Sequence, residues 1–192
     1  MPHDPSLTAF SMLMQGQDEA TIRHCLRLRR ACGTLAAELG VEGRALRELE
    51  DGALLHDIGM FRIAAGIRAK SGPLTESEWQ QIHRHPDLGA DLVGEITTLE
   101  ASAEIVRSHH ERWDGSGYPR GVAGEQIPLG ARILTVIDAF DAMCEGSRHR
   151  PRRTPEEARD EILRCSGTQF DPRVVAAFES RFQDLVRIRD SG

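Results

Sequence analysis

The stretch Leu-Leu-His-Asp-Ile-Gly at residues 54–59 decides how this chain is interpreted, together with His-His-Glu-Arg-Trp-Asp-Gly-Ser-Gly-Tyr-Pro at residues 109–119. Each stretch places a histidine directly beside a carboxylate or a second histidine. Neutral imidazoles and carboxylates are ligands that suit iron, manganese or zinc. Two such pairs far apart in the chain predict a fold that brings them together in a site for more than one metal ion.

Length and composition indicate a single globular domain. The chain has 192 residues, of which 40% are hydrophobic and 28% charged, as in ordinary globular proteins. We expect residues 1–16 to be a leader or linker remnant and residues 17–192 to form the domain. The net charge of −6 argues against a nucleic-acid polymer as partner, although bound metal ions could still hold a small phosphate ligand.

The four cysteines contain no C-x-x-C pair, and the N-terminus lacks a secretory signal pattern. A reducing cytoplasm fits this pattern best. No apolar run approaches the roughly 18 residues that a membrane helix needs, so we expect no membrane span in this chain.

Apolar residues recur at helical spacing along most of the chain, and no segment alternates as a strand would, so the expected fold class is all-α. One helix should end near Gly59, with His56 and Asp57 in its last turn. A capping box starts another helix at Thr75, and His85-Pro86 marks its junction with the next. The expected helices cover residues 18–39, 45–59, 75–84, a segment from 85, 99–110, 129–143, 154–165 and 171–182.

The ordered motifs resemble the HD superfamily of metal-dependent phosphohydrolases, and more closely its HD-GYP branch, which hydrolyses the bacterial messenger cyclic di-GMP. The similarity covers about residues 20–180. It implies a compact HD-type helical bundle with a Gly/Pro-rich loop beside the metal site. The segments that carry it lie at 24–27, 56–59, Lys70, 85–90, 109–119, 124–129, 131–133, 138–142 and 167–172.

The resemblance also implies a ligand set. Asp57 would bridge two metal ions, iron or manganese, and Ala20 stands where members with three metals carry a glutamate. A lone His-Asp or His-His pair more often has a purely structural role at a helix end, but the ordered series favours a metal site. The first metal would take His24, His56, Asp57 and Asp138, and the second would take Asp57, His85, His109 and His110.

The reaction implied by the resemblance is hydrolysis of cyclic di-GMP to pGpG, with further cleavage to GMP left open. Two metal ions activate water and position the phosphodiester, and we expect His56 and Asp57 to be catalytic. Lys70 and Arg148 are the candidate substrate-binding residues. The loop at residues 113–121 is a candidate contact surface for signalling proteins.

Two departures from the family pattern keep alternatives open. Many members have lysine where this chain has Met60, which leaves a substrate phosphate to Arg62, Lys70 or another base, and an Arg-Pro-Tyr run is replaced at residues 147–149. The domain could therefore be a cyclic di-GMP receptor or a protein-interaction module. It could also hydrolyse another cyclic dinucleotide such as cyclic GMP-AMP.

Several residues near these motifs are expected to have no catalytic or ligand role. Asp141 is expected to be structural, Asp114 to support its loop through backbone amides, and Tyr118 to pack the loop against the bundle. The remaining histidines are expected at the surface; they are His3, His83 and His149.

Overall fold

The computed structural model describes residues 19–146 and 151–191, so the predicted leader at 1–16 and the segment 147–149 lie outside the described residues. The described chain is helical, and it contains no strand, which confirms the all-α prediction. The α-helices are α2 (Glu19–Glu38), α3 (Gly43–Leu55), α4 (Ala65–Arg68), α5 (Glu76–Ile82), α6 (His85–Gly94), α7 (Ala103–Ser108), α8 (Leu129–Glu145), α9 (Pro155–Arg164), α10 (Pro172–Ser180) and α11 (Phe182–Asp190).

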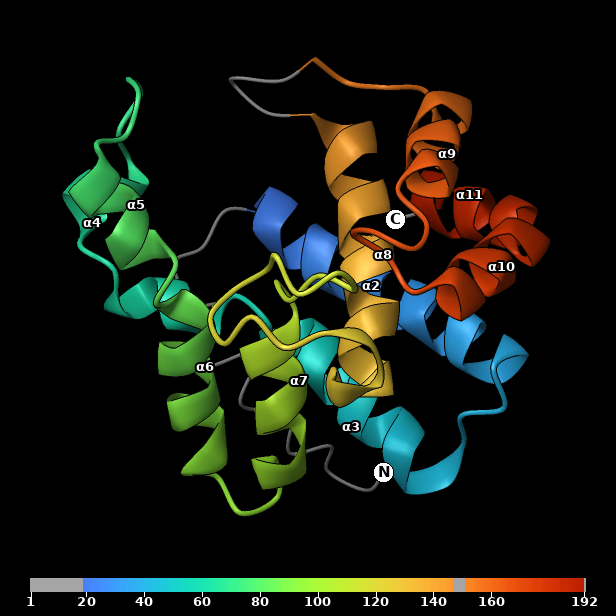
Figure 1. Ribbon diagram of the computed structural model, residues 1–192, viewed down its shortest axis with the longest axis horizontal. Helices are drawn as coiled ribbons and strands as arrows, with labels where there is room; N and C mark the ends of the chain where they lie inside the picture. Colours follow the sequence, from blue (N-terminus) through green and yellow to red (C-terminus); the bar gives the residue numbers. More distant parts are fainter. Residues whose placement is uncertain (1–18, 147–150, 192) are drawn as a thin grey trace.

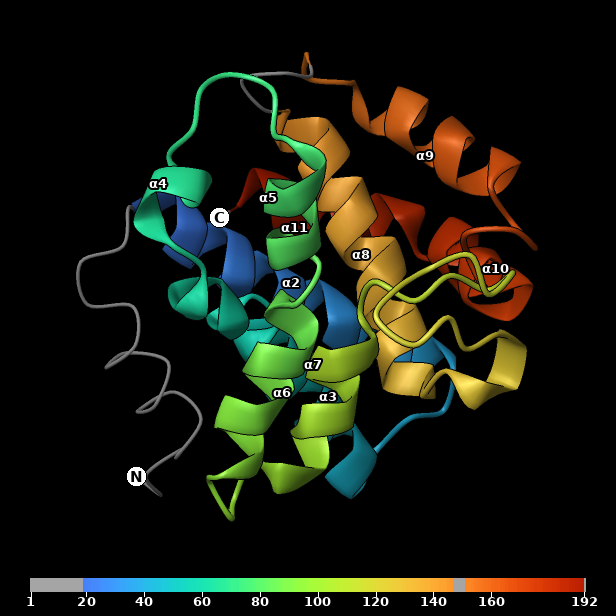
Figure 2. The same ribbon diagram turned by 60° about the vertical axis from the view of Figure 1, so that its left-hand side comes forward.

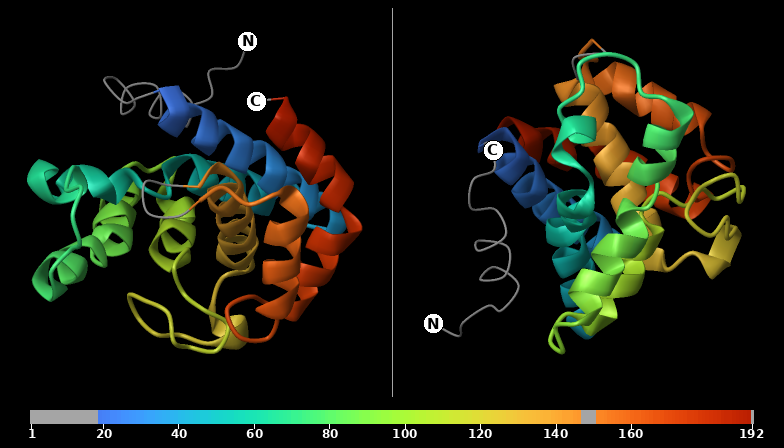
Figure 3. Two further views of the ribbon diagram at one scale, coloured as in Figure 1. Left: turned by 90° about the horizontal axis from the view of Figure 1, so that it is seen from above. Right: turned by 90° about the vertical axis from the view of Figure 1, so that its left-hand side faces the viewer.

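Helix α8 lies at the centre of the bundle. It packs against α2, α3, α7, α9 and α10, and all of its residues except Ala142 are buried or half-buried, as expected of a helix surrounded by others. Helices α9, α10 and α11 cover one side, whereas α6 and α7 form a pair on the other (Figure 1). Helices α4 and α5 stand apart at the end of the molecule farthest from α9–α11, as the view from above shows (Figure 3).

Two apolar cores hold these helices together. The larger joins α2, α3 and α8 to α9, α10 and α11, and the smaller joins α2, α3, α6 and α7. Members of the smaller core are sequence neighbours of the motif residues: Cys25 follows His24, and Leu55 and Ile58 flank the His56-Asp57 pair. Burial of these neighbours anchors the backbone from which the motif side chains project.

The prediction that His56 and Asp57 lie in the last turn of a helix is wrong in detail. Helix α3 ends at Leu55, His56 caps it, and Asp57 precedes the 3₁₀ helix η1 (Ile58–Arg62). At Gly59 the chain approaches the start of α6 so closely that a Cβ atom would overlap the His85 carbonyl oxygen. The tighter winding of η1 accompanies this close approach of the two backbones.

Other boundaries also differ from the expected ranges. The segment 99–110 begins as the 3₁₀ helix η2 (Glu100–Ser102) before α7, and a break at Arg181 ends α10, after which α11 follows. The short α4 was not predicted. The capping box at Thr75 is confirmed, since its side chain accepts a hydrogen bond from the Glu78 amide while the Glu78 carboxylate accepts one from the Thr75 amide. No helix in the described ranges is long and apolar enough to cross a membrane.

The Gly/Pro-rich loop between α7 and α8 includes the 3₁₀ helix η3 (Gly124–Gln126) and runs beside the α9–α10 connection (Figure 2). The Trp113 and Asp114 amides donate hydrogen bonds to the Gln169 and Thr168 carbonyl oxygens of that connection. Glu111, which is buried, accepts a hydrogen bond from the Arg120 amide. These bonds attach the loop to the bundle directly after the histidine pair.

Candidate metal centre

Histidine and aspartate side chains from different helices converge in one region of the bundle. Among the described residues they form two groups. Within each group, the potential ligand atoms all lie within 4.8 Å of one another. The sources are α2, the end of α3, the start of α6, the end of α7 and the middle of α8. One group is His24, His56 and Asp138; the other is Asp57, His85, His109 and His110.

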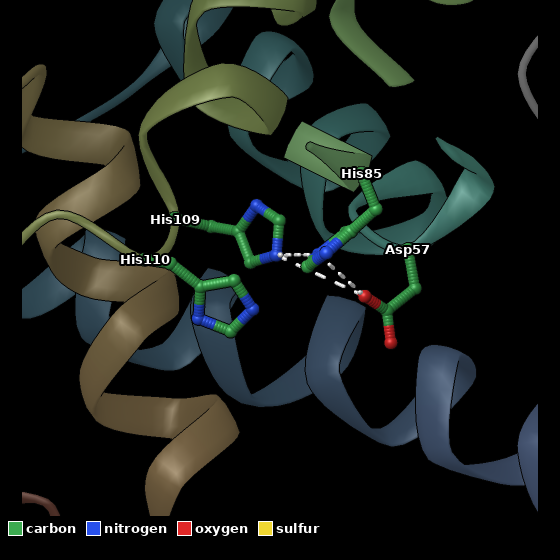
Figure 4. Close-up of side chains that lie close together, drawn as sticks. All are labelled: Asp57, His85, His109 and His110. Atoms are coloured by element: carbon green, nitrogen blue, oxygen red, sulfur yellow. Dashed lines mark hydrogen bonds and ion pairs between the residues drawn. The ribbon is translucent and has the colours of Figure 1, made fainter. Parts of the chain in front are cut away.

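The second group is compact (Figure 4). His85 Nε2 lies 3.2 Å from Asp57 Oδ1 and 3.2 Å from His109 Nε2, and His109 Nε2 lies 3.8 Å from the same Asp57 oxygen. The His110 ring lies beside these, with its centroid 4.1 Å from that of His109. The nitrogen and oxygen atoms of this group therefore face one small volume.

Backbone carbonyl groups orient the buried histidines. In each case Nδ1 donates a hydrogen bond to the carbonyl oxygen three residues earlier, at 3.0 Å for His56, 2.8 Å for His85 and 2.6 Å for His109. In the neutral tautomer this leaves Nε2 with a lone pair and no proton. The facing Nε2 atoms of His85 and His109 then cannot hydrogen-bond to each other, and a cation between them would satisfy both lone pairs. The donor set therefore fits a metal ion.

Asp57 connects the two groups. Its Oδ1 atom faces His85 and His109, whereas its Oδ2 atom lies 3.5 Å from His56 Nε2. In the first group, His24 Nε2 lies 3.4 Å from Asp138 Oδ1, and the His24 and His56 rings meet edge-on. A carboxylate with one oxygen toward each group has the geometry of a bridging ligand.

Asp141 orients His24 and lies outside both groups. Its Oδ2 atom accepts a hydrogen bond from His24 Nδ1 at 2.6 Å, and its two oxygens accept bonds from Arg27 Nε and Nη2 at 2.9 and 2.8 Å. This agrees with the predicted structural role. The part played by Arg27, which is only 8% exposed, was missed; its position three residues after His24 on the same helix was the available signal.

The charges of the site follow from burial and from these contacts. Burial by itself lowers the pKa of His24, but hydrogen bonds to Asp138 and Asp141 outweigh burial and raise the pKa to about 10. Burial lowers the pKa of His110 to about 4, and burial with neighbouring histidines holds the pKa of His109 well below its usual value. Burial alone would raise the pKa of Asp57, yet the adjacent histidines hold it well below its usual value. At neutral pH the metal-free site thus combines ionised carboxylates with neutral His109 and His110.

The other predicted site residues take different positions. The Lys70 ammonium lies 2.6 Å from Glu78 Oε2, so its charge is already paired, and Arg148 lies outside the described residues. Asp114 accepts hydrogen bonds from the Ser116 amide and hydroxyl, which confirms that it supports its own loop. His83 is exposed as predicted, although its ring also stacks on Tyr118 at a centroid distance of 4.1 Å.

The loop tyrosine connects α5 to the site. The Tyr118 ring lies between the rings of His83 and His110, at a centroid distance of 4.9 Å from the latter. Gly117 permits this course because a Cβ atom there would overlap the backbone of residues 110–112. Trp113 packs beneath the Arg132 guanidinium, with 5.6 Å between the guanidinium carbon and the ring centroid. The aromatic residues thus pack the loop onto the bundle, as the sequence predicted.

The family model for the HD domain matches residues 8–174, which is most of the chain. The chain belongs to the HD domain family. This family is metal-dependent, in agreement with the histidine and aspartate cluster. The predicted likeness of this HD domain to the HD-GYP branch is also confirmed by its curated relatives and structural neighbours.

Among curated relatives, the HD domain is 37% identical to a cyclic di-GMP phosphodiesterase of Thermotoga maritima, over 94% of this chain and 50% of that protein. It is 29% identical to 3'3'-cGAMP-specific phosphodiesterase 2 of Vibrio cholerae, over 93% of this chain and 34% of that protein. The chain thus spans half or less of the length of these relatives.

The fold is shared with solved structures. The crystal structure of a cyclic GMP-AMP specific phosphodiesterase of V. cholerae, V-cGAP3, superposes with a TM-score of 0.67 at 24% identity, over 95% of this chain and 51% of that one. This likeness shows that the helical fold is shared.

Proposed function

We propose that this HD domain is a metal-dependent phosphodiesterase that hydrolyses cyclic di-GMP to pGpG. The observation that carries the proposal is the position of Asp57, whose two carboxylate oxygens face separate groups of histidine nitrogens. Relatives named as cyclic di-GMP phosphodiesterases support the choice of substrate. Further cleavage of pGpG to GMP stays a prediction.

The residues would hold two divalent metal ions. Their nitrogen and oxygen donors suit iron, manganese and zinc, and we propose iron or manganese because the resemblance to the HD-GYP branch implies these metals. Bound ions would supply Lewis-acid activation of water and stabilisation of negative charge on the phosphodiester oxygens. One ion would be held by His24, His56, Asp57 and Asp138, and the other by Asp57, His85, His109 and His110.

The protein's own contribution is orientation and a carboxylate open to the substrate side. Asp57 has about half of its side chain exposed (51%), whereas the His56 side chain is 2% exposed. Because the pKa of Asp57 is held low, its carboxylate is ionised at neutral pH and can accept a hydrogen bond from an attacking water. His56 would hold this geometry through its Nδ1 bond to the backbone.

A second candidate function is favoured by one observation. Met60, which replaces a lysine common in the family, lines the cavity beside Asp57 and brings no charge to it. A domain without this contact could bind a cyclic dinucleotide without turnover and act as a receptor. Hydrolysis of cyclic GMP-AMP is a further substrate hypothesis, since some relatives are named for that activity.

The test is anaerobic turnover of cyclic di-GMP and cyclic GMP-AMP in parallel by protein reconstituted with iron or manganese, with metal content measured on the same samples. We expect about two metal ions per chain and formation of pGpG. The matched control is His56→Ala, which should lose turnover. Bound metal without any product would favour the receptor, and binding retained in His56→Ala would support that function.

Contacts with signalling proteins through residues 113–121 stay a prediction, as does the cytoplasmic location. The loop is available in part, because Ser116 and Arg120 are exposed and Tyr118 is partly exposed. A role of Lys70 in substrate binding would require it to leave Glu78.

A further inference from the structure

A cavity of about 190 Å³ lies beside His24 and Asp57. It is lined by residues of α2, α3, η1 and α4. It is smaller than the roughly 300–1,000 Å³ of typical ligand sites, so it suits one part of a dinucleotide rather than the whole molecule. Its lining residues come from α2, α3, η1 and α4; those used below are Asp57, Met60, Phe61 and Arg68.

Arg68 brings a positive charge to this cavity. Among the described residues that line it, Arg68 is the only lysine or arginine. Its Nε atom donates a hydrogen bond to the Ile63 carbonyl oxygen at 3.2 Å, which tethers the guanidinium, and it forms no ion pair with a described carboxylate. Lys70, in contrast, is paired with Glu78 and does not line the cavity.

The same cavity contains the position where the family resemblance predicts a lysine. Met60 lines it and offers apolar packing without a hydrogen-bond donor. Phe61, the next residue, also lines it and keeps 38% of its surface exposed. One wall of the cavity is therefore apolar and partly aromatic. The Arg68 side chain, from α4, adds a positive charge to the lining.

We propose that Arg68 binds a phosphate of the cyclic dinucleotide, in place of the lysine that Met60 replaces, while Phe61 forms a stacking surface for one base. The inference rests on the proposed function, because it assumes that a phosphodiester lies on the adjacent histidine and aspartate cluster. A guanidinium binds phosphate oxygens through two parallel hydrogen bonds. An aromatic face stacks with any nucleobase, so Phe61 would add affinity without selecting the base.

The test compares variants of the metal-loaded full chain in binding a slowly hydrolysed bis-phosphorothioate analogue of cyclic di-GMP, and in turnover of cyclic di-GMP itself. We expect Arg68→Ala to raise both Kd and KM by roughly 10- to 100-fold, the range for a lost charge-assisted hydrogen bond, with a smaller change in kcat. Arg68→Lys should be intermediate. Phe61→Leu should weaken analogue binding by roughly 5-fold or more, since stacking is lost.

Matched controls separate the charge from the fold. Arg68→Gln removes the charge while keeping a polar side chain that can reach the Ile63 carbonyl, so it should behave like Arg68→Ala. Introducing Met60→Lys into the Arg68→Ala background should recover part of the lost affinity. Arg187→Ala, which removes an arginine that is 76% exposed on α11, should change neither constant.

The outcomes distinguish the inference from the function beneath it. If the wild type hydrolyses cyclic di-GMP but Arg68→Ala and Arg68→Gln keep its Kd and KM, phosphate binding by Arg68 is refuted. The proposed phosphodiesterase activity is then supported. If the wild type binds the analogue in an Arg68-dependent manner without turnover, the site stands and the phosphodiesterase is wrong. Absence of both binding and turnover in the metal-loaded wild type overturns both.

Discussion

Replacing Asp141 with asparagine should weaken one metal position more than the other. Asp141 accepts the His24 Nδ1 hydrogen bond at 2.6 Å, and its side chain is only 7% exposed, so this charge-assisted bond is largely shielded from water. An asparagine in the same place cannot offer a full negative charge to His24 or Arg27. His24 would lose the contact that sets its ring orientation.

The size of the effect follows from known contributions of groups that support metal ligands. Loss of such a partner lowers metal affinity by about 10- to 100-fold, or roughly 1.4–2.7 kcal/mol. The group formed by Asp57, His85, His109 and His110 has no contact with Asp141 among the described residues, and its histidines are held by backbone carbonyls instead. Its affinity should fall by a smaller factor than that of the first position, because only the shared ligand Asp57 connects it to the altered group.

The assay is anaerobic calorimetric titration of metal-free protein with Mn²⁺, which should resolve two binding steps in the wild type and a selective weakening of one step in Asp141→Asn. Asp160→Asn, which alters a carboxylate that is 65% exposed on α9, is the matched control. The variant should stay folded because asparagine can still accept a hydrogen bond from Arg27. Circular dichroism would verify that it is folded. Equal weakening of both steps, or of neither, in a folded variant would refute the reasoning.

Three further predictions concern the same site. Asp57→Ala should abolish turnover and reduce metal content while the far-ultraviolet spectrum stays helical, and unchanged activity would contradict the bridging role. Gly59→Ala should lower the free energy of unfolding by at least about 2 kcal/mol in urea, because its Cβ overlaps the α6 backbone, whereas Gly66→Ala, which has open space, should cost nothing. In metal-free protein, hydrogen bonds to His24 and Arg27 outweigh burial and lower the pKa of Asp141 from 3.8 to about 2. The stability from this carboxylate is therefore present above about pH 4 and is lost as the pH falls to 2, so the stability difference from Asp141→Asn should shrink by about 2 kcal/mol over that interval. Urea denaturation at several pH values measures this difference, and a constant gap would exclude the ionisation as its source.

Helix prediction succeeded where the signal was local. The Thr75 capping box and the buried periodicity of α8 are encoded within a few residues, so sequence spacing is enough to place them. The predicted end of α3 was wrong, and the start of α11 was missed. The first depends on the close approach of Gly59 to α6, and the second on packing of the C-terminal segment against α2.

The same distinction applies to the site. The sequence by itself determined the all-α class, the family and the set of histidines and aspartates, because their order and spacing are properties of the chain alone. Only the tertiary structure decided that Asp57 directs one oxygen toward each group, that Asp141 holds His24, and that Arg68 rather than Lys70 enters the cavity beside Met60. These pairings join residues up to 117 positions apart, and packing of helices around α8 sets them rather than any local preference.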